Sequence, residues 1–117
     1  MYRLNKATRL TGKNRFARVF RARKVRANRL FRIHHARGSG LESEVGARLG
    51  ITVSRKVHRL AVERNRIRRQ IRESFRLRRR QLKANDYVVR ARPAAADADN
   101  AALRTALNEL WEWFERE

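Results

Sequence analysis

The stretch LAVERNRIRRQIRESFRLRRRQLK, residues 60–83, carries the strongest helical pattern in this chain. It contains no Gly or Pro. A helix that advances about 100° per residue gathers its apolar side chains into one stripe. That stripe consists of Ile67, Ile71, Phe75 and Leu82. The sequence therefore predicts a long amphipathic helix whose stripe is buried against the rest of the fold.

Arginines lie immediately beside this stripe. On the same helical projection Arg68, Arg72 and Arg79 fall next to it, with Asn65 and Arg76 slightly further round. A flank in that position lies where the helix meets the layer on which it packs. We therefore expect these side chains at the edge of a cleft, and not only on the outer, solvent-facing side.

Strands are predicted on the N-terminal side of the helix. Residues 24–37 alternate around Phe31 and Ile33, and residues 47–54 show a clear period of two. The residues between them, 38–44, form a loop by their Gly and Ser content. Two strands joined by a loop suggest an antiparallel pair.

A short helix is predicted before the first strand, over about residues 12–22. Phe16, Val19 and Phe20 fall on one face of it, and basic residues occupy the remainder. Two such rings belong either to the core or to a platform on which bases stack. The preceding residues, 1–10, have the composition of a basic tail.

After the long helix, residues 86–92 (DYVVRAR) form a strand that ends before Pro93. Residues 93–99 are expected to be a loop, and residues 100–115 a last amphipathic helix. The order of elements is α-β-β(-β)-α-β-α. It indicates an α+β fold, a two-layer α/β sandwich, in a single domain that spans residues 1–117.

The charge of the chain points to a polyanionic partner. There are 31 Lys and Arg against 11 Asp and Glu, a formal net charge of +20. Residues 55–80 alone hold 12 basic and two acidic residues. A helix so charged repels itself unless an anion lies against it. Nucleic acid is the anion that such a surface fits best.

The sequence offers little for an active site of its own. It has no Cys, which removes disulfides, thiolate metal sites and cysteine nucleophiles. His34 and His35 point to opposite faces of a strand, so the two cannot chelate one metal. Glu63 and Glu73 lie about 15 Å apart along the helix, too far to share a metal. No apolar run is long enough for a membrane span, and we expect a cytoplasmic protein.

A family resemblance rests on the long helix and on the segments around it. The run RNRIRRQIRESF, residues 64–75, closely resembles the RNR helix of the bacterial ribonuclease P protein component. The resemblance continues, in the order of that family, through Phe16 with VF at residues 19–20, ANR at 27–29, GITVSRK at 50–56 and DYVV at 86–89. It covers about residues 9–93 well, and the C-terminal helix only in character.

The resemblance implies the protein subunit of an RNA-based endoribonuclease that removes the 5′ leader of precursor tRNA. The implied partners are the ribonuclease P RNA subunit and that leader. In the family, catalysis and the Mg²⁺ ions belong to the RNA, so no catalytic residue and no cofactor of its own are expected in this chain. The implied fold includes a left-handed βαβ crossover through the long helix, against the usual right-handed rule.

The resemblance also assigns residues to RNA-binding surfaces. A cleft between the long helix and the sheet receives the leader, and Phe16, Phe20 and His34 would line it, the last where the family often has a tyrosine. Additional basic contacts are expected from Arg55 and Lys56. The RNA-binding residues of the RNR helix would be Arg64, Asn65, Arg66, Arg68, Arg69 and Arg72.

Two other functions fit parts of the sequence. A small ribosomal protein, or another structural RNA-binding protein, would have the same size and charge, but the RNR run and the paired phenylalanines argue against it. A self-sufficient nuclease is disfavoured because the carboxylate pattern of a metal site is missing. Cleavage assays with and without a ribonuclease P RNA separate the three.

Overall fold

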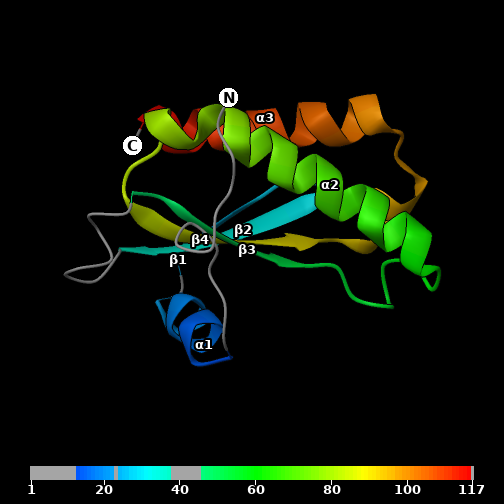
Figure 1. The fold of residues 1–117 in the computed structure, drawn as a ribbon, viewed down its shortest axis with the longest axis horizontal. Coiled ribbons are helices and arrows are strands. Elements are labelled where there is room, and N and C mark those ends of the chain that lie inside the picture. The colour runs from blue at the N-terminus through cyan, green and yellow to red at the C-terminus, as the bar shows by residue number, and fades with distance from the viewer. Residues whose placement is uncertain (1–12, 23, 38–45, 117) are drawn as a thin grey trace.

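The computed structural model describes residues 13–22, 24–37 and 46–116. The predicted basic tail and the loop at residues 38–44 lie outside these ranges. The described elements, in chain order, are α1 (Lys13–Arg21), β1 (Lys24–Ala27), β2 (Phe31–Arg37), β3 (Arg48–Thr52), α2 (Ala61–Arg78), the 3-10 turn η3 (Arg79–Gln81), β4 (Asn85–Ala91), the 3-10 turn η4 (Pro93–Asp97) and α3 (Asn100–Arg116) (Figure 1). The predicted α+β class and order of elements are confirmed.

The four strands form one sheet in the order β1-β2-β4-β3. β2 pairs antiparallel with β1 and with β4, and β3 pairs parallel with β4. The predicted antiparallel pairing of residues 24–37 with residues 47–54 is therefore wrong, because β4 lies between the two segments. β4 suits this central place since Tyr87, Val88 and Val89 are apolar on both faces and almost fully buried. α2 joins the parallel pair; the left-handed sense of this crossover stays a prediction.

Residues 24–37 form two strands of a hairpin instead of one strand. The side-chain oxygen of Asn28 accepts hydrogen bonds from the backbone N–H groups of Leu30 at 3.1 Å and Phe31 at 3.0 Å. Such a turn is a preferred use of Asn. The Asn28 amide also donates to the backbone oxygen of Ala106 in α3 at 2.8 Å, which ties the turn to the helical layer. β1 is the exposed outer strand that results.

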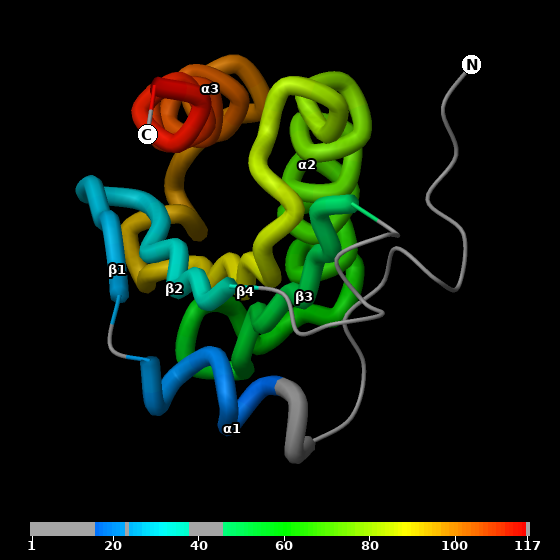
Figure 2. Tube along the Cα trace, turned by 90° about the vertical axis from the view of Figure 1, so that its left-hand side faces the viewer, coloured from blue at the N-terminus to red at the C-terminus, as the bar shows by residue number. Residues whose placement is uncertain are grey.

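Helices α2 and α3 cover one face of the sheet, and α1 lies against the other (Figures 1 and 2). The predicted stripe of α2 is confirmed, because Ile67, Ile71 and Phe75 are fully buried and Leu82 nearly so. This stripe, the apolar side of α3 and the α2-facing side chains of the sheet form the main core. α1 adds a partial third layer to the sandwich. None of the described helices is long and apolar enough to cross a bilayer.

The segment after β4 also differs from the prediction. Residues 93–97 are not an open loop but the turn η4, which begins at Pro93. Proline suits this first position because it has no N–H to satisfy and its φ is preset for a helix. Ala95 is fully buried in the main core. The turn therefore carries the chain from the end of β4 over the sheet into α3.

Candidate nucleic-acid interface

The face of the sheet under α1 is built from alternate residues of three strands. The strand registers align them in three rows across β2, β4 and β3. The rows are Arg32, Arg90 and Thr52; then His34, Val88 and Gly50; then Ala36, Asp86 and Arg48. α1 packs over the second and third rows through Val19, which forms a small cluster with Ala36 and Val88. In the first row Arg32 and Arg90 are exposed and Thr52 is half-buried.

A buried carboxylate anchors α1 on this face. Asp86, which is 1% exposed, accepts hydrogen bonds from Nε and Nη2 of Arg48 at 2.8 and 2.9 Å. It also pairs with Arg18 of α1, and Arg18 donates to the backbone oxygen of Arg37 at 3.0 Å. Removing one member of a buried ion pair leaves an uncompensated charge, so these groups hold the helix in one place.

Three rings come together beside α1. The centroids of Phe16 and Phe20 lie 6.4 Å apart and those of Phe20 and His34 4.8 Å apart, both edge to face. All three side chains are half-buried, so the rings are neither wholly core nor wholly exposed. Phe16 lies over Gly50, where an added Cβ would come within 2.7 Å of the ring. The absence of a side chain at Gly50 therefore makes room for Phe16.

The sequence-based expectation of a cleft between the long helix and the sheet is wrong. The space between α2 and the sheet is filled by the main core, with Ile67, Ile71 and Phe75 fully buried. Phe16, Phe20 and His34 lie on the opposite face, under α1. The reason is that both faces of this sheet are covered, and α1 packs on the face that α2 does not use.

Two arginines adjoin these rings. The guanidinium of Arg90 lies 5.6 Å from the centroid of Phe20, within the range of a cation–π contact. Arg32 is its direct partner across β2 and β4. Burial, and then the charges of Arg90 and Arg32, lower the pKa of His34, so its ring is neutral at pH 7. We name Phe16, Phe20, His34, Arg32 and Arg90 the aromatic surface.

One polar atom of the aromatic surface has no partner. Nε2 of His34 is buried, and no described residue forms a hydrogen bond with it. An unpaired buried polar atom costs free energy unless a partner reaches it.

The predicted arginine flank of α2 follows β3, the outer strand of the sheet. Nη2 of Arg68 donates to the backbone oxygen of Val53 at 3.2 Å, just past one end of the strand. Nε of Arg79 donates to the backbone oxygen of Ala47 at 3.0 Å, just before the other end. Arg72 lies between them in α2 and is exposed. The expectation that this flank lies where helix meets sheet is confirmed.

Comparison with known proteins decides the family. The family model for Ribonuclease P matches residues 4–115. The chain belongs to the ribonuclease P protein family. It is 45% identical over 111 residues to the ribonuclease P protein component of Halorhodospira halophila, an alignment that covers 93% of this chain and 87% of the relative.

Solved structures of ribonuclease P proteins have the same fold. The RNase P protein of Staphylococcus aureus superposes with a TM-score of 0.83 at 32% identity, over 92% of this chain and 95% of that one. The RNase P protein of Thermotoga maritima superposes with a TM-score of 0.76 at 28% identity, over 93% and 96% of the two chains. The chain is thus the RNA-binding protein subunit of the ribonuclease P ribonucleoprotein, which acts in tRNA processing. This decides against the ribosomal-protein alternative.

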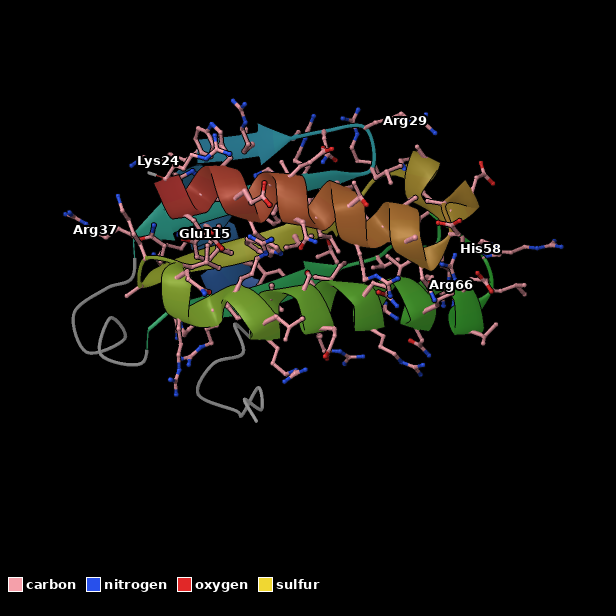
Figure 3. The ribbon with its side chains drawn as sticks, turned by 90° about the horizontal axis from the view of Figure 1, so that it is seen from above. Lys24, Arg29, Arg37, His58, Arg66 and Glu115 are labelled. Carbon is pink, nitrogen blue, oxygen red and sulfur yellow. The ribbon has the colours of Figure 1, made fainter. Side chains whose placement is uncertain are left out.

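The RNR helix of this ribonuclease P protein does not direct all its arginines to one side. Nη1 of Arg64 donates to the backbone oxygens of His58 at 2.9 Å and Arg59 at 2.8 Å, which fastens the turn before α2. Arg66 lies on the side that faces α3 (Figure 3). It donates to the side-chain oxygen of Asn100 at 2.8 Å. Arg64 therefore fixes the start of α2, and Arg66 ties α2 to the start of α3.

The other predicted RNA-binding residues reach the solvent or the β3 edge. Oδ1 of Asn65 accepts a hydrogen bond from Arg68 at 2.8 Å, so this amide orients the guanidinium. Arg55 and Lys56 lie in the turn after β3, next to the Arg68 end of the flank. Exposed members of the predicted set are Asn65, Arg69, Arg72, Arg55 and Lys56.

Sequence reasoning missed Arg32, Arg90 and Asp86 as parts of the site. The signal that could have found them is the period of two in β2 and β4, which puts Arg32 beside His34 and Arg90 on the same face as Asp86. Using it required knowing that these two strands are neighbours. Within residues 13–22, 24–37 and 46–116, no group of three or more His, Asp and Glu side chains is arranged to hold a metal ion.

Proposed function

We propose that this protein binds the 5′ leader of precursor tRNA on the aromatic surface and the ribonuclease P RNA subunit along the arginine flank. The observation that carries the proposal is that the two surfaces adjoin at β3. Phe16 lies over Gly50 on one side of that strand, and Arg68 and Arg79 bond to the backbone just beyond its two ends. An RNA strand on the aromatic surface would therefore lie beside the RNA held by α2.

The aromatic surface has the chemistry of a sequence-tolerant single-strand site. Rings that are half-buried keep one face or edge for a base, and stacking accepts any base. Arg32 and Arg90 supply positive charge for the phosphates that follow. These properties suit leaders, which differ in sequence among tRNAs.

The arginine flank and the turn before α2 have the chemistry of a phosphate-backbone site. Asn65, Arg68, Arg69 and Arg72, with Arg55 and Lys56, would contact RNA, while Arg64 and Arg66 would position the helix. This charge offsets phosphate repulsion near the cleavage site, so that Mg²⁺ ions bound by the RNA can settle there. We propose that the chain acts in this role as one domain over residues 1–117 and in the cytoplasm.

Cleavage assays test the division of labour between protein and RNA. The purified protein alone should leave precursor tRNA uncut. Adding the RNA subunit at low Mg²⁺ should give a single cut at the mature 5′ end, and the protein should lower the Mg²⁺ needed. Metal-dependent cleavage by rigorously RNA-free protein would contradict the proposal.

Salt dependence tests the arginine flank. Arg72→Ala should lower the log–log slope of RNA-subunit affinity against salt by about 0.7–0.9, the value for one lost phosphate contact. Arg104→Ala on the exposed side of α3 is the matched control, since it removes the same charge away from the flank. Equal slopes for the two variants would count against an RNA contact at Arg72.

A further inference from the structure

A second basic site lies on the other face of the sheet. It is a pocket of about 440 Å³ at the end of the strands where α3 finishes. Its floor comes from two neighbouring cross-strand rows, Lys24 with His35 and Tyr87, and Arg37 with Asn85. Residues directly opposite one another on paired strands point to the same face. The sheet therefore brings these five side chains together on the α2/α3 face, away from the aromatic surface.

Buried rings form a rigid wall of this pocket. The ring of His35 stacks on that of Tyr87 at 6.3 Å and meets that of Phe114 edge to face at 4.8 Å. Tyr87 and Phe114 are almost fully buried. Burial raises the pKa of Tyr87 to about 12, so its hydroxyl stays protonated and neutral. A charge beside such a wall is less screened than one on an open surface.

The charges at the pocket are of one sign. Lys24, Arg37 and Lys83 line it, and within the described part of the chain no carboxylate pairs with any of them. Glu115 is at the same end of the molecule, but it pairs with Arg78 at 3.1 Å (Figure 3). Two of the five lysines of this arginine-rich chain are in the pocket. Three cations without a carboxylate partner among the described residues favour an anionic ligand and disfavour a cationic one.

We propose that this pocket, named here the lysine pocket, binds a phosphate group of RNA and is a second RNA contact on the face opposite the aromatic surface. The inference rests on the RNA-binding function above. Lysine ammonium groups bind phosphate as point charges, and an arginine beside them adds directed donors. The Asn85 amide can donate as well. The volume accommodates a phosphate with its attached ribose, so one nucleotide unit of a strand can enter.

Salt titration of RNA affinity tests the lysine pocket. The double variant Lys24→Gln/Lys83→Gln is compared with Arg29→Gln/Arg104→Gln, which removes the same charge; Arg29 lies at the opposite end of the molecule from Lys24 (Figure 3). All four side chains are exposed, so both variants should melt like the parent protein. With the RNA subunit or with precursor tRNA, the pocket variant should lower the log–log slope by about 0.7–0.9 more than the control. Coincident slopes for both RNAs would overturn the proposal.

Inorganic phosphate provides a second test of the lysine pocket. Adding it to the parent protein and to the control variant should shift the NMR signals of His35 and Asn85, and the pocket variant should not show these shifts. If phosphate shifts these signals while the RNA slopes stay equal, the pocket takes a free anion and the proposal is wrong. Adding Phe20→Ala to both double variants should leave the difference between their log–log slopes unchanged. A failure of the leader site is thus seen separately from a failure of the lysine pocket.

Discussion

The two faces of the sheet differ in what their side chains do. On the α2/α3 face, Phe31, Ile33 and Val89 are fully buried and pack on helices whose stripes are apolar. On the α1 face, the fully covered cluster is limited to Val19, Ala36 and Val88, with Phe16 and Phe20 partly buried against it. Charged groups occupy much of the remaining α1 face, namely Arg32, Arg90, Arg48 and Asp86.

The difference teaches where stability and binding reside in so small a protein. Apolar area removed from water is the main stabilising term, so most of the folding free energy comes from the α2/α3 face. The α1 face can then keep half-buried rings and exposed cations, which stabilise little and which form the proposed leader site. Changes on the two faces should therefore separate into losses of stability and losses of RNA affinity.

The largest effect is expected from Trp111→Ala on the α2/α3 face. Trp111 is fully buried among Phe75, Tyr87 and Phe114, and its Nε1–H donates to Oγ of Ser74 at 3.0 Å. Removing a buried Trp costs about 3–5 kcal/mol of unfolding free energy. Urea unfolding followed by circular dichroism measures it.

Trp113→Ala is the control for that measurement. Trp113 is only partly buried, and the guanidinium of Arg26 stacks on its ring at 4.5 Å. It should lose clearly less stability than Trp111→Ala. Equal losses would show that the α2/α3 core is not where stability is concentrated.

Asp86→Asn should have the next largest effect. It should lower both the stability of the fold and the affinity for precursor tRNA. The change removes the carboxylate charge that pairs with Arg48, which is 3% exposed, and with Arg18 of α1. Breaking such a buried pair costs about 3 kcal/mol of stability. Affinity for precursor tRNA should also fall at temperatures where the variant is folded, since Phe16 and Phe20 lose their fixed position. Asp97→Asn, at an exposed site, should change neither quantity.

Phe20→Ala should act on binding and not on the main core. Loss of one base stack costs about 1–3 kcal/mol of affinity, and only for substrates that carry a leader. The salt dependence should stay unchanged, because no cation is removed. Binding to precursor and mature tRNA, with a melt of the variant, measures this. A variant that unfolds, or that loses affinity equally for both RNAs, would show that the ring is only packing.

The smallest effect is a pH dependence on the α1 face. The folded-state pKa of His34 lies below its ordinary value, so the unfolded chain takes up a proton first as pH falls. The stability contribution of neutral His34 is present above about pH 6.5 and is lost progressively below it. His34→Gln should flatten the curve of unfolding free energy between pH 7 and 5.5. Parallel curves for His34→Gln and the parent protein would contradict this account.

The sequence by itself determined the local elements and the family. The long helix, its stripe of Ile67, Ile71 and Phe75, and the alternation in β3 follow from periods of 3.6 and two residues, which are properties of neighbours along the chain. The RNR run and the paired phenylalanines identified the family and its RNA partner class. The position of Arg68 and Arg79 beside the stripe also predicted the arginine flank, because an angle on a helix is local geometry.

The tertiary structure decided which segments meet. The sequence offers no local signal that β4 inserts between β2 and β3, since strand pairing depends on contacts between residues far apart in the chain. The same holds for the side of the sheet that Phe16 and Phe20 cover, for the turn of Arg66 toward α3, and for the meeting of Arg18 and Arg48 at Asp86. Each depends on how helices and strands that are distant in the sequence pack together. For Phe16 and Phe20, the reason is that α1 packs on the face of the sheet that α2 and α3 leave free.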